Sequence, residues 1–171
     1  MKTLSVFNPA NAEKIADLPA DDAASVAEKF QLASTAQKQW AQVPFAQRLA
    51  CLQKFRTLVQ EQLPELATIM TLETGKPIQL SHNELNGFLG RLDFFLAEAE
   101  KSTSSETVFA DGSMTEVIEH VPLGVIGNIS AWNYPWFVGG NVFVPALLTG
   151  NAVLYKPSEF ASMTGQAMAK T

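Results

Sequence analysis

The sequence predicts an α/β fold in which N-terminal helices pack on an incomplete, Rossmann-like parallel sheet. Two observations carry this prediction. Through residue 103, apolar residues recur at intervals of three and four, the spacing of amphipathic helices. Residues 121–155 then contain no charged residue and are divided by prolines and glycines, which is typical of buried parallel strands joined by a buried helix. With 47% hydrophobic residues, the 171-residue chain can bury a core.

The N-terminal segment predicts a hairpin followed by a helix. Residues 4–7 and 14–18 alternate between apolar and polar on either side of a turn that contains Pro and Asn. Asp21 and Asp22 suit the first turn of a helix, because their charges complement its positive end. We expect this helix to run to about Trp40.

Prolines and a glycine divide the next segment into further helices. One helix is predicted to open at Pro44. Another is predicted to begin at Pro64, since the first position of a helix tolerates a residue without an N–H, and to end at Gly75. A longer helix is predicted from Pro77 to about Glu100, despite internal glycines.

The composition changes after these helices. Residues 101–105 form a connector rich in Ser and Thr, and residues 111–113, Asp-Gly-Ser, predict a hairpin turn. Residues 114–121 then alternate like a strand.

A β-α-β unit is predicted in the charge-free segment. It comprises a strand at 123–130, a helix over about 135–148 and a strand at 152–156. Parallel strands joined in this way form a right-handed crossover, and ligands bind at their carboxyl ends. Here those ends are residues 130–133 and 156–159.

Composition also narrows the function classes. Acidic residues outnumber basic ones, 17 to 12, and no run of Lys or Arg could follow a phosphate backbone, so we expect no nucleic-acid partner. Cys51 is the only cysteine, which excludes an internal disulfide and a thiolate zinc site; we expect no metal. A lone thiol fits a reducing cytoplasm. The N-terminus lacks an apolar signal region, and the divided segment 121–155 is no membrane span.

Asn133 stands between the first of these strands and the helix that follows it, and two interpretations are open. It can be an N-cap that satisfies the free N–H groups of the helix, whose first residue would be Pro135. It can also be an NH2 donor directed at a developing oxyanion.

Lys156 and Glu159 follow the second strand and also allow two interpretations. A lone Lys is usually a solvated surface charge. A Lys that ends a charge-free strand, however, projects into the crevice where a dinucleotide would lie, and the pair could hold ribose hydroxyls as donor and acceptor.

Taken together and in this order, these segments resemble the coenzyme-domain signature of the aldehyde dehydrogenase superfamily. The resemblance covers essentially the whole chain and suggests its N-terminal portion. The matching segments are FNPA at 7–10, LETGKP at 72–77, PLGVIG at 122–127, WNYP at 132–135, PALLTGNAV at 145–153 and KPSE at 156–159. Departures are small: Ser130 and Ala131 stand where relatives often have apolar residues and Pro, and Asn11 stands where Gly is usual.

The resemblance implies roles for individual residues. The side-chain amide of Asn133 would form the oxyanion hole together with a backbone N–H of the catalytic thiol residue. The residues implied to line the cofactor cleft are Ile129, Ser130, Ala131, Trp132, Lys156, Ser158 and Glu159. Those implied to line the substrate tunnel are Tyr134, Phe137, Val138 and Asn141.

For a full-length enzyme, the resemblance implies NAD(P)-dependent oxidation of an aldehyde to a carboxylic acid through attack by a thiolate. Glu159 favours NAD, because its charge would repel a 2′-phosphate, and NADP is not excluded. The family's nucleophilic Cys, general-base Glu and pyrophosphate-binding helix start find no counterpart in residues 1–171. We therefore expect the catalytic domain to be absent and this chain alone to be inactive.

The resemblance also implies an organisation. Residues 1–103 would be the helical part of the coenzyme-binding domain, 104–122 a bridging and oligomerisation segment, and 123–171 the start of the Rossmann-like sheet. Residues 114–121 resemble the strand used in subunit assembly, which implies a homodimer or homotetramer. A broken third crossover would expose sheet edge, so Thr171 is expected to be a truncation point.

Alternative functions belong to other classes. The chain could be a non-catalytic truncated product, at most a nucleotide-binding or assembly fragment. An acyl-phosphate or acyl-thioester reductase would share fold and thiol chemistry, but WNYP and KPSE favour aldehyde oxidation. We expect Cys51 to be a structural or partly buried residue, since no His motif activates it, and Glu73 to be part of a helix terminus.

Overall fold

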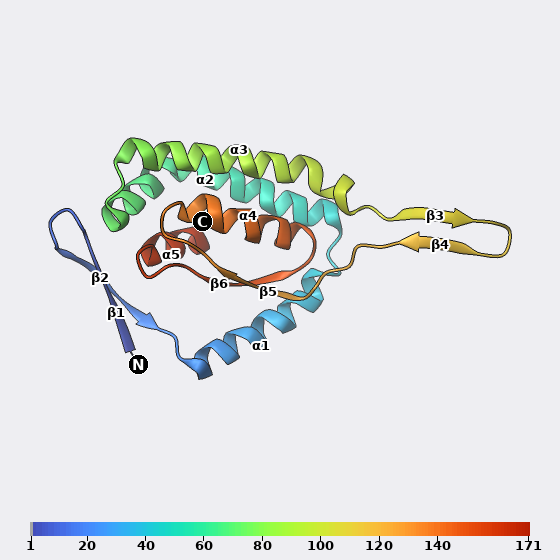
Figure 1. Cartoon of the computed structure of the whole chain (residues 1–171), viewed down its shortest axis with the longest axis horizontal. Helices are drawn as coiled ribbons and strands as arrows, with labels where there is room; N and C mark the ends of the chain where they lie inside the picture. The colour runs from blue at the N-terminus through green and yellow to red at the C-terminus, as the bar shows by residue number, and fades with distance from the viewer. Residues whose placement is uncertain (1) are drawn as a thin grey trace.

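The computed structural model describes residues 2–171 and arranges them in layers (Figure 1). The strands are β1 (Lys2–Phe7), β2 (Lys14–Ala20), β3 (Glu106–Ala110), β4 (Thr115–Ile118), β5 (Val125–Ile129) and β6 (Ala152–Lys156). The helices are α1 (Ala23–Trp40), α2 (Phe45–Thr74), α3 (Ile78–Thr103), α4 (Pro135–Leu148) and α5 (Ser162–Lys170). The long helices α2 and α3 lie side by side and pack on α4. α4 covers one face of the parallel pair β5–β6, and α1 covers the other.

The predicted N-terminal hairpin and helix are confirmed. β1 and β2 pair antiparallel, with Lys2 opposite Ala20 and an irregularity after Val6. Asp22 caps α1, because its carboxylate accepts from the Ser25 N–H at 3.0 Å and the Ser25 hydroxyl accepts from the Asp22 N–H at 2.9 Å.

The predicted helix boundary at Pro64 is wrong, because α2 continues through this residue to Thr74. A proline in a helix interior ordinarily costs about 3 kcal/mol, since it removes an N–H and crowds the preceding turn. Leu63 lies on one side of Pro64 and Leu66 and Ala67 lie on the other, all buried in the core. Burial of this apolar stripe on both sides of the proline favours one continuous helix over two.

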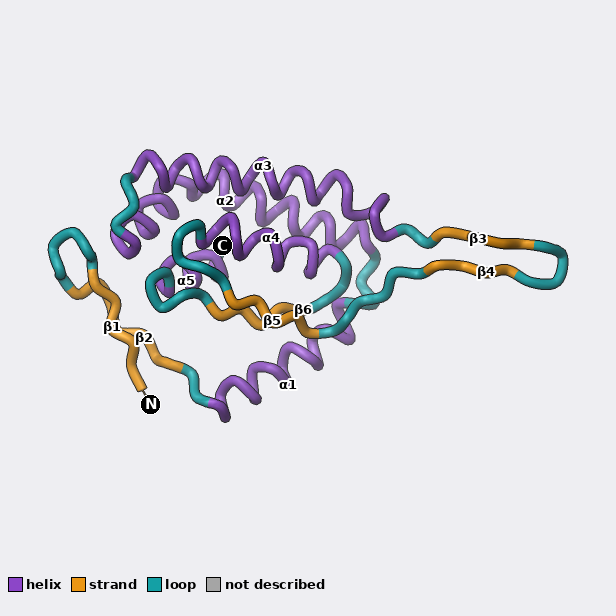
Figure 2. The backbone as a smooth tube through the Cα atoms, viewed as in Figure 1, coloured by secondary structure: helices purple, strands orange, loops and turns teal. Residues whose placement is uncertain are grey.

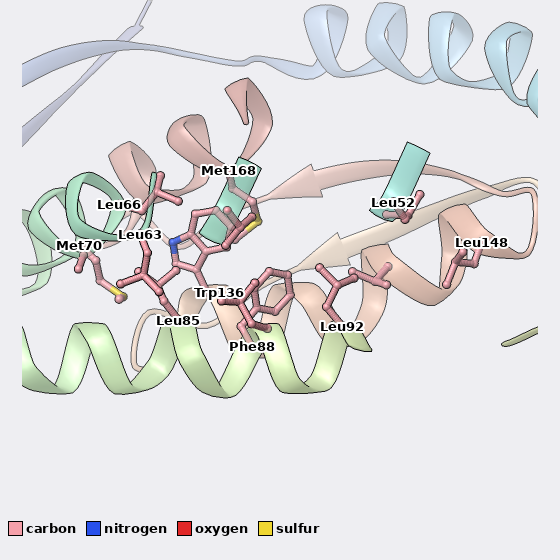
Figure 3. Close-up of a cluster of buried hydrophobic side chains, with 14 of the residues drawn as sticks. Leu52, Leu63, Leu66, Met70, Leu85, Phe88, Leu92, Trp136, Leu148 and Met168 are labelled. Atoms are coloured by element: carbon pink, nitrogen blue, oxygen red, sulfur yellow. The ribbon is translucent and has the colours of Figure 1, made fainter. Parts of the chain in front are cut away.

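The core lies between α2, α3 and α4 (Figure 3). Phe88 of α3 and Trp136 of α4 are fully buried, with ring centroids 5.5 Å apart. A Cβ atom on Gly140 would overlap the ring of Phe88, so glycine permits the close approach of α3 and α4 at this point. None of the helices in residues 2–171 has a stretch long and apolar enough to cross a membrane.

The β-α-β unit is confirmed, with one correction. β5 and β6 are parallel, and α4 connects them. The strands were expected to be buried, but most of their residues are only half-buried, because β5 and β6 pair only with each other in the described chain. α5 follows β6, as expected for the start of another crossover.

β3 and β4 form a hairpin that extends away from the helices (Figure 2). The predicted turn is confirmed: the Asp111 carboxylate accepts from the N–H groups of Ser113 at 2.7 Å and Met114 at 2.9 Å. The strand expected at 114–121 is shorter, Thr115–Ile118. Every residue of both strands is exposed, so no packing against the helices extends the pairing.

Candidate functional site

The carboxyl ends of β5 and β6 meet at one edge of the sheet. The register pairs Ile129 with Lys156, and the Ser130 N–H donates to the Lys156 carbonyl at 3.0 Å. The segments 130–133 and 156–159 are therefore neighbours, as the sequence predicted. This edge is where ligands bind in parallel α/β folds.

The residues that follow β5 differ in exposure. Ile129 and Ala131 are exposed and Trp132 is about half exposed, whereas Ser130 is buried. The hydroxyl of Ser130 lies beneath the edge with that of Tyr155, and neither has a hydrogen-bond partner within residues 2–171. Burial raises the pKa of Tyr155. Both are thus neutral groups below the surface, and the other three side chains are open to a ligand.

The residues that follow β6 place two opposite charges at the same edge. The Lys156 ammonium lies 3.5 Å from a Glu159 carboxylate oxygen, and both side chains are more than half exposed. A backbone hydrogen bond and the charge of Lys156 lower the pKa of Glu159, so this carboxylate is ionised at neutral pH. Ser158 is buried and accepts a hydrogen bond from the Phe160 N–H at 3.3 Å. Ser158 therefore shapes the turn, while Lys156 and Glu159 remain accessible.

Asn133 lies in the turn between β5 and α4. The interpretation of Asn133 as an N-cap is wrong, because Tyr134 holds that position and no side chain of the cap residue bonds to the helix. The Asn133 side chain is exposed and makes no hydrogen bond to the described part of the chain. Its amide is thus free of the role that the simplest interpretation gave it.

A buried glutamate of α3 takes over the N-terminus of α4. One Glu84 carboxylate oxygen accepts from the N–H groups of Trp136 at 2.9 Å and Phe137 at 3.4 Å. The other oxygen forms an ion pair with Lys76. The Lys76 ammonium also donates to the Asn133 carbonyl at 2.7 Å.

A second buried glutamate does the same for α5. Glu73, near the end of α2, accepts from the N–H groups of Met163 at 2.7 Å and Thr164 at 2.8 Å. It also accepts from the Thr164 hydroxyl at 2.9 Å. Glu73 does lie at a helix terminus, as expected, and its carboxylate caps a different helix.

These carboxylates decide what the helix ends can bind. A free helix N-terminus attracts phosphate, because its N–H groups and dipole are positive. The N-termini of α4 and α5 are already satisfied by Glu84 and Glu73. Neither helix start is therefore available for a pyrophosphate, whereas Lys156 and Glu159 stay exposed at this edge.

The face of α4 next to this edge lines a second hollow. Tyr134 and Phe137 line a cavity of about 490 Å³ together with residues of α3. The α3 residues are Leu80, Asn83, Glu84 and Gly87. Val138 and Asn141 lie further along α4 and do not line this cavity. The structure therefore brings two of the four predicted tunnel residues together.

A cleft of about 540 Å³ borders the same edge on its other side. Trp132, Glu159 and Phe160 line it, and the rings of Trp132 and Phe160 meet edge to face at 6.5 Å. The opposite wall is formed by β1 and the end of α2. Within residues 2–171, no cluster of His, Cys, Asp or Glu is arranged to hold a metal ion.

Cys51 was expected to be structural or partly buried; it is exposed, so partial burial is wrong. It borders an apolar groove with Leu147, near the C-terminal end of α4. Asn133 precedes the other end of this 14-residue helix, which spans about 20 Å at 1.5 Å per residue. Cys51 and the Asn133 amide therefore do not form one site.

Sequence reasoning gave no role to Lys76 and Glu84, and it expected Glu73 only at a helix terminus. A signal for the glutamates was present, since each interrupts an apolar helical stripe. Glu84 follows Ser81 by three positions and precedes Phe88 by four, all on the buried side of α3. A charged residue on such a face requires a partner. The backbone N–H groups that they cap, however, lie dozens of residues away in the sequence.

Comparison with known proteins agrees with this architecture. Residues 1–171 match the family model described as aldehyde dehydrogenase family. The chain is 32% identical over 168 residues to 3,6-anhydro-alpha-L-galactose dehydrogenase of Streptomyces coelicolor, covering 98% of this chain and 34% of that protein.

Solved structures confirm the predicted α/β, Rossmann-like arrangement. The crystal structure of an aldehyde dehydrogenase from Brucella melitensis biovar abortus 2308 matches with a TM-score of 0.93 and 26% identity, covering 99% of this chain and 35% of that one. NADP-dependent glyceraldehyde-3-phosphate dehydrogenase from Bacillus halodurans C-125, complexed with NADP, matches with a TM-score of 0.91 and 28% identity, covering 99% and 37%. The chain thus spans about a third of the length of these proteins.

Proposed function

The chain belongs to the aldehyde dehydrogenase family, and on that premise we propose that it supplies the oxyanion donor and the adenosine side of the cofactor cleft for an NAD(P)-dependent oxidation of an aldehyde to a carboxylic acid. The meeting of two segments at one sheet edge carries the proposal. The exposed amide of Asn133 follows β5 there, and the charges of Lys156 and Glu159 follow β6.

The Asn133 amide suits a donor to a negatively charged oxygen. Its NH2 group offers two N–H bonds, and no residue of the described chain occupies them. The N–H groups of Trp136 and Phe137 are satisfied by Glu84, so the side chain rather than the helix end is the available donor. An aldehyde oxygen gains negative charge when a nucleophile adds to the carbonyl. One well-placed donor then lowers the barrier by about 3–4 kcal/mol.

The edge beside β6 suits an adenosine ribose. The Lys156 ammonium can donate to a ribose hydroxyl, and the Glu159 carboxylate can accept from one. Ile129, Ala131 and Trp132 offer exposed surface at the same edge, with Ser130 and Ser158 buried beneath it. When bound, NAD or NADP supplies the hydride acceptor for the oxidation. Glu159 favours NAD, because a 2′-phosphate would meet its charge.

The aldehyde is proposed to approach along α4. Phe137 and Val138 lie three and four positions after Tyr134, and Asn141 lies four and three positions after them, so the four residues share one face of the helix. The cavity beside Tyr134 and Phe137 supports an apolar approach to Asn133, which lies next to Tyr134 in the chain.

We also propose a division of labour along the chain. Residues 1–103 form the helical part of a coenzyme-binding domain, and 123–171 begin its parallel sheet. Residues 104–122, which include the extended hairpin, form an assembly arm for a homodimer or homotetramer. The large apolar residues that the hairpin exposes support this role, since such surface ordinarily finds a partner. They are Val108, Phe109, Met114, Val117 and Ile118.

The nucleophile of this reaction is proposed to come from outside the described residues. Cys51 is the only thiol of the 171-residue sequence, and it lies near the opposite end of α4 from Asn133. An exposed thiol without a disulfide partner fits a reducing compartment, so the cytoplasm is the proposed location.

The test uses the protein at its natural length, with propanal, 3,6-anhydro-L-galactose and glyceraldehyde 3-phosphate as probe aldehydes and with NAD and NADP. Asn133→Ala is expected to lower kcat about a hundredfold or more, because the oxyanion loses its donor. Lys156→Ala is expected instead to weaken cofactor binding and to leave kcat at saturating cofactor nearly unchanged.

The two variants check each other in steady-state kinetics and cofactor titration. Lys38→Ala removes another exposed Lys, in α1, and is the matched control for loss of charge. Wild-type rates in Asn133→Ala would refute the oxyanion role. An unchanged cofactor dissociation constant in Lys156→Ala would refute the ribose contact.

A further inference from the structure

The turn that carries Asn133 is held by a charge from another helix connection. Lys76 lies between α2 and α3, 57 positions before Asn133, and its ammonium donates to the Asn133 carbonyl at 2.7 Å. The same ammonium lies 4.3 Å from the centre of the Tyr134 ring, a cation–π contact with the next residue. Lys76 thus contacts both residues of the turn on either side of their peptide bond.

Glu84 extends this contact to the helix that follows the turn. Its side chain is fully buried, and the side chain of Lys76 retains only 12% exposure. One Glu84 oxygen pairs with Lys76, and the other accepts from the Trp136 and Phe137 N–H groups. A single ion pair therefore fixes the turn and the first turn of α4 relative to each other. In this protected position the geometry is specified by charge-assisted hydrogen bonds rather than by a mobile surface pair.

The Asn133 side chain has no such restraint of its own. It is exposed and makes no hydrogen bond to residues 2–171, so the described chain restrains it through the position of the Cα–Cβ bond that bears it. On that backbone unit, the Asn133 carbonyl accepts from the Lys76 ammonium at 2.7 Å. A displacement of the carbonyl would turn the Cα–Cβ bond and move the NH2 group with it.

We propose that Lys76 and Glu84 form a positioning pair that aims the Asn133 amide at the developing oxyanion. The inference rests on the proposed function, in which Asn133 is the donor. Neither Lys76 nor Glu84 touches the reacting atoms; they act through the peptide unit of Asn133 and the first turn of α4. A pair that merely capped α4 would stabilise the fold without affecting the rate through Asn133.

A double-mutant cycle on the protein at its natural length separates these roles. Lys76→Met is made in the wild type and in the Asn133→Ala variant, and kcat and kcat/KM are measured with propanal and NAD. In the wild type, Lys76→Met is expected to lower both about ten- to a hundredfold, because a misplaced donor loses its transition-state contact. In Asn133→Ala it is expected to lower neither further, and the NAD dissociation constant is expected to stay constant throughout.

A second variant guards against misfolding. Lys76→Met leaves the buried Glu84 carboxylate without its cation, which destabilises a fold strongly. Lys76→Met combined with Glu84→Gln leaves no unpaired charge, and the amide oxygen can still accept from the Trp136 N–H. We expect the same loss of kcat in this combination. Lys29→Met is the matched control. It breaks the exposed ion pair between Lys29 in α1 and Asp21 before α1, and it is expected to keep wild-type kcat.

The outcomes distinguish failure of the inference from failure of the proposed function. An equal loss of kcat from Lys76→Met in both backgrounds would show that Lys76 acts independently of Asn133, which overturns the positioning role. Full kcat in the folded combination of Lys76→Met and Glu84→Gln would overturn it as well. Wild-type kcat in Asn133→Ala would instead refute the oxyanion donor itself, and with it the premise.

Discussion

The N-termini of the two helices that follow the parallel strands are each capped by a buried glutamate from another helix, yet the two glutamates have different partners. Glu84 of α3 caps the start of α4, and its carboxylate contacts both backbone N–H groups and the ammonium of Lys76. Glu73 of α2 caps the start of α5. It accepts from two N–H groups and the Thr164 hydroxyl, and no cation pairs with it in residues 2–171.

The difference teaches how one local requirement can serve two purposes. Both glutamates satisfy N–H groups that a helix start leaves free, and both do so from a helix that is distant in sequence. Only Glu84 is linked, through Lys76, to the residue before the helix that carries the proposed donor, Asn133. The start of α5 is capped, whereas the start of α4 is capped and also connected to the candidate site.

The largest expected effect compares the removal of each carboxylate. Glu84→Ala leaves a nearly buried ammonium without its counter-ion and two backbone N–H groups without an acceptor, so we expect the free energy of unfolding to fall by about 3–5 kcal/mol. Glu73→Ala leaves hydrogen-bond donors without an acceptor but leaves no unpaired charge, so we expect the free energy of unfolding to fall by about 1–3 kcal/mol. Urea unfolding followed by circular dichroism measures both. Equal losses would remove the distinction between the two caps.

A smaller effect compares the tightest glycine contact of each helix. In Gly140→Ala the new methyl group meets the fully buried ring of Phe88 in the core, and we expect a loss of about 1–3 kcal/mol. In Gly165→Ala it would lie 2.7 Å from the ring of Pro157, which is only half-buried. The higher helix propensity of Ala offsets part of that strain. A midpoint of thermal unfolding that falls further for Gly165→Ala would contradict this ranking.

The smallest effect contrasts the buried ion pair with an exposed one. Arg56 of α2 and Asp93 of α3 pair at 2.9 Å on the surface, and Arg56→Met is expected to cost only about 0–1 kcal/mol. The Arg56 guanidinium lowers the pKa of Asp93, so the pair stabilises the fold above the unfolded-state pKa and loses this contribution as the pH falls through the lower folded-state value. The difference between variant and wild type should therefore disappear in acid. A difference that grew in acid would contradict the assignment.

Local signals explain which parts of the fold could be predicted. The alternation around the first turn, the acids before α1 and the division of 121–155 by Pro and Gly each depend on neighbouring residues, and each gave the observed element. The helix boundary predicted at Pro64 is wrong because the local cost of the proline is outweighed by apolar contacts of Leu63 and Leu66 with the core. The exposure of Cys51 was not predicted, because its position in a helix does not determine which other elements cover its side chain.

The candidate site divides in the same way. The proximity of the segments around Asn133 and Lys156 could be predicted from the sequence, because residues at the carboxyl ends of neighbouring parallel strands meet at one edge. The choice between an N-cap and a free amide at Asn133 was not readable, because it depends on Glu84, which lies 52 positions before Trp136.

The sequence by itself determined the order of the elements, the parallel edge and the residues that stand there. Spacing, turn residues and charge are local properties, and they act before the chain folds. Only the tertiary structure decided which group caps each helix and which amide stays free. Those choices depend on satisfying buried charges and N–H groups among helices that come together solely in the folded core.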